Sequence, residues 1–170
     1  FRLQKKAAIS PPAGAMRPNL ILWPEASTPW AVRDEPKMRE WTEALVARAK
    51  APLLLGSVAV DRAGQPDEAW INGAFLVDPV RGVQPESYAK RHLVPFGEYV
   101  PFRPILGWLE KIVPVGGDFR AGDNPAPLLL ALKDTPVSLG PLICYEDTFP
   151  GLARDSVRSG ADVLVVLTNN

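Results

Sequence analysis

The sequence predicts an α/β domain whose sheet contains both parallel and antiparallel strands. Strand-like and helix-like segments alternate at the beginning and end of the chain, and strand-like segments follow one another in between. Alternation favours parallel strands joined through helices, whereas direct succession favours hairpins, so the two together predict a mixed sheet. The composition agrees, because 46% of the 170 residues are hydrophobic and 22% are charged, as in ordinary globular domains.

A first helix is expected after a short apolar run near the start of the chain. Pro36 suits the first turn of a helix, and Asp34 or Glu35 precedes it as a cap. The helix is expected to end near Lys50. One apolar stripe at helical spacing defines its buried face: Met38, Trp41 and Leu45.

Strands are expected wherever a short apolar run is bounded by turn residues. These runs are, in chain order, residues 19–23, 53–60, 69–77, 83–90, 128–132, 135–143 and 162–168. The fifth and sixth runs flank residues 133–134, which predicts a hairpin. No run reaches the roughly 18 residues of a membrane-spanning helix.

The remaining segments predict a second long helix and a loop. Residues 148–159 suit a helix that Asp147 or Thr148 caps and Gly160 ends. Residues 93–104 contain several prolines and are expected to form an ordered loop. A short helix is expected over residues 105–112.

Charge and residue counts exclude several kinds of function. Lys+Arg and Asp+Glu both number 19, so the formal net charge is zero and nothing favours a nucleic-acid partner. With one histidine, His92, the sequence has no histidine-rich metal motif. Neither a metal nor another cofactor is expected. With one cysteine, Cys144, no internal disulfide can form.

The ends of the sequence favour a piece of a longer protein. The chain begins at Phe1 without an initiator Met, and it stops where a buried strand is expected to lead into a loop. We therefore expect a domain that is incomplete at its C-terminus.

Cys144 lies where an apolar strand gives way to helix-compatible sequence. A thiol on such a turn stands at the rim of a sheet, where a substrate can reach it. Most lone cysteines are small buried hydrophobes, however, so the position indicates a nucleophile only if partners can be found for it.

Two polar side chains are candidates for these partners. Glu25 follows the first predicted strand, and α/β sheets place ligand groups at the carboxyl ends of strands. Lys90 would favour a thiolate and stabilise an oxyanion. Taken alone, each has an ordinary alternative as a solvated surface residue. The loop after Lys90 is unusually rich in prolines and large apolar residues; within it, Glu98 could orient Lys90, and His92 is a second candidate base that ranks below Glu25.

Three sequence blocks in this order resemble the nitrilase (carbon–nitrogen hydrolase) superfamily. They are Trp23-Pro24-Glu25, Lys-Arg-His-Leu-Val-Pro-Phe-Gly-Glu-Tyr-Val-Pro from Lys90, and Ile-Cys-Tyr-Glu around Cys144. The resemblance implies an α-β-β-α sandwich with mixed sheets. It also implies that Glu25 is the general base, Lys90 the oxyanion-stabilising group and Cys144 the nucleophile. The supporting active-site residues that it implies are Glu98, Tyr145 and Glu146.

The second and third blocks look more narrowly like the apolipoprotein N-acyltransferase family. Thr168-Asn169 also resembles that family, although Asn170 stands where an Asp is usual. The resemblance implies that Cys144 takes a fatty acyl chain from a phospholipid as a thioester. The N-terminal amine of a diacylglyceryl-cysteine lipoprotein then receives the chain. It further implies that residues 1–170 are part of a catalytic domain on the periplasmic side of the bacterial inner membrane, with membrane helices elsewhere in the whole protein.

Two other functions remain open at this point. A soluble amidase of the same superfamily would use the same three residues to hydrolyse a C–N bond, with water as the second nucleophile. A non-catalytic interaction domain would keep the sandwich and lose the activity, although all three residues are present here. Upstream apolar segments of about 20 residues would favour the acyltransferase over the soluble amidase.

Overall fold

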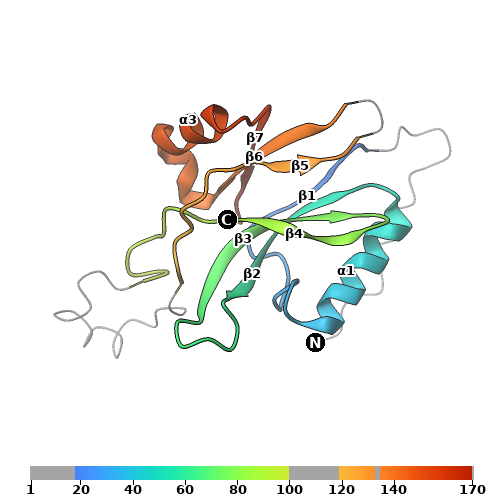
Figure 1. Cartoon of the computed structure of the whole chain (residues 1–170), viewed down its shortest axis with the longest axis horizontal. Helices are drawn as coiled ribbons and strands as arrows, with labels where there is room; N and C mark the ends of the chain where they lie inside the picture. Colours follow the sequence, from blue (N-terminus) through green and yellow to red (C-terminus); the bar gives the residue numbers. More distant parts are fainter. Residues whose placement is uncertain (1–17, 100–118, 133–134, 170) are drawn as a thin grey trace.

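The computed structural model describes residues 18–99, 119–132 and 135–169. Within these residues, two sheets lie face to face and a helix lies on the outer side of each (Figure 1). The elements in chain order are β1 (Ile21–Trp23), α1 (Pro36–Ala49), β2 (Leu53–Asp61), β3 (Ala69–Asp78), β4 (Gly82–Ala89), β5 (Leu128–Leu130), β6 (Val137–Ile143), the 3-10 helix η2 (Cys144–Thr148), α3 (Pro150–Arg158) and β7 (Val163–Leu167).

The first sheet has the order β1-β2-β3-β4 and is mixed, as predicted. β1 runs parallel to β2, with Ile21 opposite Leu53, and α1 makes the crossover between them. β2, β3 and β4 follow one another as antiparallel strands. The carboxyl ends of β1, β2 and β4 therefore lie at one end of the sheet.

The second sheet has the order β5-β6-β7 and is also mixed. β5 and β6 are antiparallel, which confirms the predicted hairpin, although its turn at residues 133–134 lies outside the described residues. β6 and β7 are parallel and joined through η2 and α3. Gly140 in β6 allows α3 to pack closely, because an added Cβ would lie 3.1 Å from the Cβ of Ser156.

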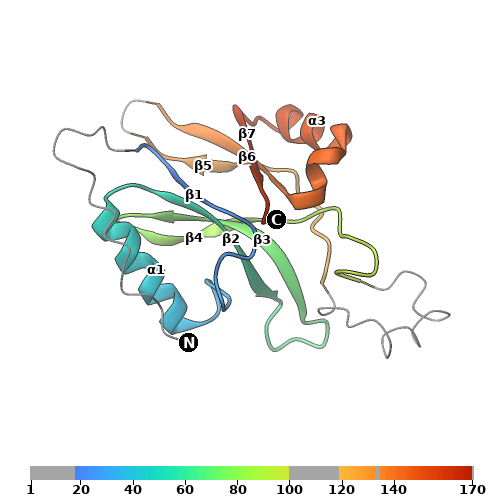
Figure 2. The ribbon, with the colours of Figure 1, turned by 180° about the vertical axis from the view of Figure 1, so that it is seen from behind.

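Apolar side chains fill both sides of the first sheet. Between the two sheets, Leu54, Ala74 and Tyr88 pack against Leu139 and Val165 of the second sheet. On the other side, Val46 of α1 belongs to a separate cluster with apolar side chains of β2, β3 and β4. The layers are therefore α-β-β-α, which confirms the predicted fold class (Figure 2).

The buried face of α1 differs from the predicted one. Its buried side chains are Met38, Thr42 and Val46, whereas Trp41 remains 36% exposed. Thr42 can occupy the stripe because its hydroxyl donates a hydrogen bond to the carbonyl oxygen of Met38, at 2.8 Å. Trp41 packs at the edge of the helix against Trp23, with 6.0 Å between ring centroids. Leu45 is half-buried.

The predicted N-cap of α1 is correct in position, whereas that of α3 is wrong. Glu35 occupies the N-cap position of α1, but its side chain makes no capping hydrogen bond to the described residues. The Asp34 carboxylate instead accepts a hydrogen bond from the Val60 amide. α3 begins at Pro150, and the two residues expected to cap it, Asp147 and Thr148, belong to the preceding 3-10 helix.

The predicted helix ends and loops are partly covered by the described residues. α1 ends before Lys50, and Gly160 follows α3 with φ of 98°, as expected for residues that stop a helix. The short helix expected over residues 105–112 lies outside the described residues, as does the second half of the expected loop over 93–104. In the part of the chain that is described, no helix has the length and apolar character needed to cross a bilayer.

Candidate active site

The predicted site residues follow the carboxyl ends of three strands. Glu25 comes two residues after β1, Lys90 directly after β4, and Cys144 directly after β6. Since β1 and β4 point the same way in the first sheet, Glu25 and Lys90 reach the same end of it.

Lys90 is buried between two carboxylates. Its Nζ lies 3.2 Å from Oε1 of Glu25 and 3.0 Å from Oε1 of Glu98, and its side chain is only 1% exposed. Burial alone lowers the pKa of an ammonium. The hydrogen bond and charge of Glu98, together with those of Glu25, outweigh this effect and raise the pKa of Lys90 above its ordinary value. Lys90 is therefore a fixed cation at neutral pH.

The backbone beside Glu25 is held against β2. The Ser27 amide and hydroxyl both donate to the carbonyl oxygen of Gly56, at 2.9 and 3.0 Å. An added Cβ on Gly56 would lie 2.5 Å from the Pro24 oxygen and 2.6 Å from the Cα of Glu25. Only glycine at position 56 lets the chain carry Glu25 this close to the sheet.

The loop after Lys90 orders Glu98 by short-range hydrogen bonds. Oε2 of Glu98 accepts a hydrogen bond from the Val94 amide at 2.9 Å, and the Glu98 amide donates to the Val94 carbonyl at 3.0 Å. One oxygen of Glu98 is thus bound by its own loop, and the other faces Lys90. The loop after Lys90 thus holds the Glu98 carboxylate against the lysine ammonium.

Cys144 occupies a strained position at the junction of β6 and η2. Its φ is 51°, in the left-handed region that is costly for residues other than glycine. The residue is half-buried and packs against the core between the sheets. Such backbone strain is concentrated at functional sites in proteins. Among the described residues, the Cys144 thiol makes no hydrogen bond to Glu25 or Lys90.

Glu146 connects the cysteine turn to the lysine loop. Its Oε1 accepts hydrogen bonds from the amides of Arg91 (2.6 Å) and His92 (3.0 Å). Its Oε2 accepts from the Ile143 amide at 2.8 Å and from the Tyr88 hydroxyl at 2.9 Å. The fully buried carboxylate thus binds the residues directly after Lys90 and the residue directly before Cys144.

Tyr88 and several aromatic residues lie near the hydrogen bonds of Glu146. Burial and the charge of Glu146 raise the pKa of the Tyr88 hydroxyl, which therefore remains a neutral donor. The His92 ring packs on Phe149, with 3.9 Å between centroids, so it serves as a packing residue in this structure. Tyr145 meets Phe149 edge-on and remains 43% exposed, so it can contact a ligand.

Asn72 is a site residue that the sequence reasoning missed. Its side-chain amide nitrogen lies 2.7 Å from Oε1 of Glu25 and 3.0 Å from Oε1 of Glu98. The available signal was a polar residue in the middle of the apolar strand β3, which is unusual for a buried position. The structure thus unites Glu25, Lys90 and Glu98 through direct contacts that include Asn72, and Glu146 joins the cysteine turn to them.

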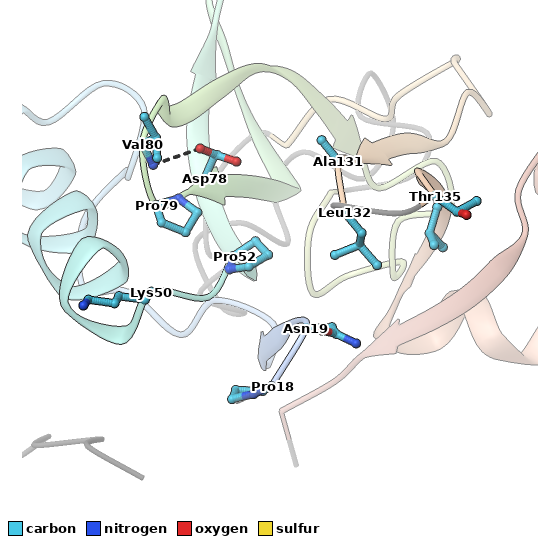
Figure 3. A pocket seen from close by; sticks show the side chains of 11 residues that line it. Pro18, Asn19, Lys50, Pro52, Asp78, Pro79, Val80, Ala131, Leu132 and Thr135 are labelled. Atoms are coloured by element: carbon cyan, nitrogen blue, oxygen red, sulfur yellow. Dashed lines mark hydrogen bonds between the residues drawn. The ribbon is translucent and has the colours of Figure 1, made fainter. Parts of the chain in front are cut away.

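Two pockets differ in their position relative to this site. A concavity of about 320 Å³ beside the lysine loop is lined by Arg91, His92, Leu93, Tyr99, Phe119 and Ala121. A larger pocket of about 700 Å³ lies at the opposite end of the first sheet, near Pro52, Asp78 and Leu132 (Figure 3). None of the predicted site residues lines this larger pocket, so its volume is unrelated to the site.

The Glu25, Lys90 and Glu98 side chains together can perform acid–base chemistry. A carboxylate beside an ammonium can take and return a proton, and the ammonium can stabilise negative charge that develops on a carbonyl oxygen. A cysteine ordinarily ionises near pH 8.5, so a nearby base and cation are what make it a useful nucleophile at neutral pH.

Comparison with known proteins places the chain in a family. The carbon–nitrogen hydrolase family model matches residues 3–170, and the chain belongs to that family. Among curated proteins, it is 36% identical over 169 residues to the apolipoprotein N-acyltransferase of Geobacter metallireducens, covering 99% of this chain and 30% of that protein. It is 37% identical over 172 residues to the enzyme of the same name from Rhizobium rhizogenes, with 96% and 30% covered. The chain therefore spans less than a third of the length of these relatives.

Solved structures agree on the fold. A variant of the amidase from Nesterenkonia sp. AN1, with the acetamide moiety of fluoroacetamide on its active-site cysteine, aligns with a TM-score of 0.58 at 20% identity. This alignment covers 88% of the present chain and 51% of the amidase chain. A carbon–nitrogen hydrolase from Helicobacter pylori G27 aligns with a TM-score of 0.57 at 20% identity, covering 88% of this chain and 48% of the other. At these identities the likeness shows the fold.

Proposed function

We propose that the protein containing this chain is an apolipoprotein N-acyltransferase. It transfers a fatty acyl chain from a phospholipid, through a thioester on Cys144, to the N-terminal amine of a diacylglyceryl-cysteine lipoprotein. The observation that carries the proposal is the identity of 36% to a curated protein of that name along 99% of the chain. The buried Glu25–Lys90–Glu98 contact and its link to the cysteine turn support it.

In the first stage, Glu25 takes the thiol proton and the Cys144 sulfur attacks the ester carbonyl of the phospholipid. Negative charge develops on the carbonyl oxygen, where the ammonium of Lys90 stabilises it. The C–O ester bond then breaks, and the departing alkoxide of the lysophospholipid takes the proton back from Glu25. The concavity beside the loop that follows Lys90, which includes Leu93, Tyr99 and Phe119, offers apolar surface for the acyl chain.

In the second stage, the lipoprotein amine attacks the thioester carbonyl. Glu25 accepts the proton from the amine, the C–S bond breaks, and the thiolate regains a proton from Glu25. A thioester suits this role because the acyl group remains activated for attack by an amine. Supporting positions fall to Glu98, which contacts Lys90, to the buried Glu146 and to the exposed Tyr145.

We further propose that residues 1–170 are part of the catalytic domain, on the periplasmic side of the bacterial inner membrane. Membrane helices elsewhere in the whole protein would hold it there. The support is that the relatives are bacterial proteins of which the chain covers about 30%.

The test is intact-mass analysis of the full-length protein after incubation with phospholipid. The expected result is a fatty-acyl increment that hydroxylamine removes and that peptide mapping assigns to Cys144. The matched control is Cys144→Ala, which should carry no increment. A label on another residue, or none at all, would overturn the proposed mechanism.

The soluble amidase is the alternative that shares Glu25, Lys90 and Cys144. The amidase with a solved structure is only 20% identical to the chain, which shows the fold without favouring this activity. Addition of a small amide substrate separates the two functions, because an amidase would release ammonia while an N-acyltransferase would leave the amide intact and require a lipid donor.

A further inference from the structure

We propose that Asn72 is a positioning residue that holds the carboxylates of Glu25 and Glu98 in place around Lys90. The inference deepens the proposed function and rests on it, since it concerns how the same site is kept ready for proton transfer. Asn72 lies in β3, which pairs directly with β4 and is separated from β1 by β2. It therefore belongs to none of the segments that carry the predicted triad.

The geometry is a closed set of four hydrogen bonds. Oε1 of Glu25 receives one from Lys90 Nζ at 3.2 Å and one from Asn72 Nδ2 at 2.7 Å. Oε1 of Glu98 likewise receives one from Lys90 Nζ and one from Asn72 Nδ2, both at 3.0 Å. Lys90 and Asn72 therefore each donate to both carboxylates, and each carboxylate is held by both donors.

The orientation of the Asn72 amide follows from its neighbours. The opposite orientation would place the amide oxygen against two carboxylate oxygens, which is repulsive, so the nitrogen must face them. In the described part of the chain, the amide oxygen that results is buried without a hydrogen-bond partner. A buried acceptor without a partner is costly. The two hydrogen bonds that the Asn72 amide nitrogen donates to Glu25 and Glu98 offset this cost.

The two donors, Lys90 and Asn72, have different roles. Lys90 carries one positive charge against two carboxylates, so a neutral donor is needed to hold the second carboxylate without adding another cation. Among the described residues, Oε2 of Glu25 receives no hydrogen bond, because both donors bind Oε1. Asn72 thereby keeps the Glu25 carboxylate turned so that its second oxygen is left for the proton of the thiol.

Three variants of the full-length protein test this role. Asn72→Asp keeps the shape but replaces the donor with a carboxylate. Asn72→Leu keeps a similar volume without any polar atom, and Asn72→Ser leaves one small donor. Asn19→Asp makes the same charge change at an exposed position at the far end of β1 and serves as the matched control. The measurements are the rate of acyl-enzyme formation from phospholipid and the rate at which iodoacetamide alkylates Cys144, each against pH.

We expect Asn72→Asp to slow both reactions at least tenfold at about pH 8, and we expect this deficit relative to the wild type to shrink toward about pH 5.5. At the lower pH the introduced carboxyl is protonated and can again donate a hydrogen bond. Asn72→Leu should give a deficit of similar size that does not change with pH, and Asn19→Asp should match the wild type.

A pH-independent deficit in Asn72→Asp, or a deficit below twofold, would overturn the inference. If Asn72→Asp does not fold, Asn72→Ser decides, because one retained donor predicts a smaller deficit than Asn72→Leu shows. The alkylation profile requires no lipid. The absence of an acyl-enzyme in the wild type would refute the proposed function, whereas an unaltered alkylation profile in the variants would refute the role of Asn72.

Discussion

At the scale of single residues, the positive charge of Lys90 compensates two neighbouring carboxylates. Its ammonium separates the carboxylates of Glu25 and Glu98, which are themselves mostly buried. Removing one partner from a buried ionic group leaves the others without compensation. The residue is therefore expected to matter for the stability of the protein as well as for its chemistry.

Lys90→Met tests this expectation. We expect the free energy of unfolding to fall by about 3–5 kcal/mol at neutral pH, because two carboxylates then face each other without a cation. Urea unfolding of the wild-type and variant proteins measures it. Lys37→Met, at an exposed position of α1, is the matched control and should change the free energy of unfolding little. A loss below about 1 kcal/mol would contradict the expectation.

The pH dependence of this difference has a definite sign. The pKa of Lys90 is raised in the folded protein, so folding favours its protonated form. Its stabilisation is fully present below the unfolded-state pKa of about 10.4, and it is lost as the pH rises through the higher folded-state pKa. The stability difference between wild type and Lys90→Met should therefore stay constant near neutral pH and decrease only in strongly alkaline solution.

At the scale of elements, the turn from β6 into η2 is held by one carboxylate. Glu146 accepts hydrogen bonds from the amides of Arg91, His92 and Ile143, which belong to two separate segments. These hydrogen bonds tie the short 3-10 helix that begins at Cys144 to the lysine loop.

Glu146→Gln is expected to loosen that turn. A glutamine offers one oxygen instead of two, and its amide nitrogen would face backbone N–H groups, so buried donors would lose their partner. We expect a loss of about 3 kcal/mol in the free energy of unfolding. Slower alkylation of Cys144 by iodoacetamide should accompany it. Glu40→Gln, on the exposed side of α1, makes the same change without these contacts and should leave both measurements unaltered.

The strands were predictable from the sequence because apolar runs bounded by turn residues determine them locally. All seven expected strands are present with shifts of a few residues at their ends. The helix details were less predictable. A periodic count of apolar residues favoured Trp41, whereas the structure buries Thr42, whose hydroxyl is satisfied within its own helix.

The candidate site was only partly predictable for a related reason. Glu25, Lys90 and Glu98 could be named from motifs, and the structure brings these three together. Asn72 carries no local motif, since its partners come from segments 47 and 26 residues away. Contacts of that kind depend on the register of the strands, which no short stretch of sequence encodes.

At the scale of the whole molecule, the two sheets are joined by an apolar core and by a polar contact at one end. The Tyr88 hydroxyl on β4 donates to Glu146, which follows β6 in the other sheet. This contact joins residues 58 apart in sequence and lies at the end of the sandwich that carries the candidate site. It couples the relative position of the sheets to the distance between the lysine loop and the cysteine turn.

Tyr88→Phe tests that coupling. Without the hydroxyl, Glu146 loses one of its donors in a buried setting, and we expect the free energy of unfolding to fall by about 1–3 kcal/mol. Thermal or urea unfolding measures it, together with acyl-enzyme formation, which should become slower. Tyr145→Phe removes a hydroxyl from an exposed ring and is the control for stability alone. Equal stability of the two variants would show that the inter-sheet hydrogen bond contributes nothing.

At Cys144 the proposed chemistry and the stability of the fold favour different residues. The chemistry requires a thiol, whereas the left-handed backbone favours glycine. Glycine adopts φ of 51° freely, whereas any side chain there is disfavoured by about 1 kcal/mol or more. Cys144→Gly should therefore unfold at a higher urea concentration than Cys144→Ala, although neither can form a thioester; the reverse order would show that the backbone is relaxed at this position. The Cys144→Gly variant would therefore be inactive and more stable than Cys144→Ala, which suits it to capturing the bound acyl donor unreacted.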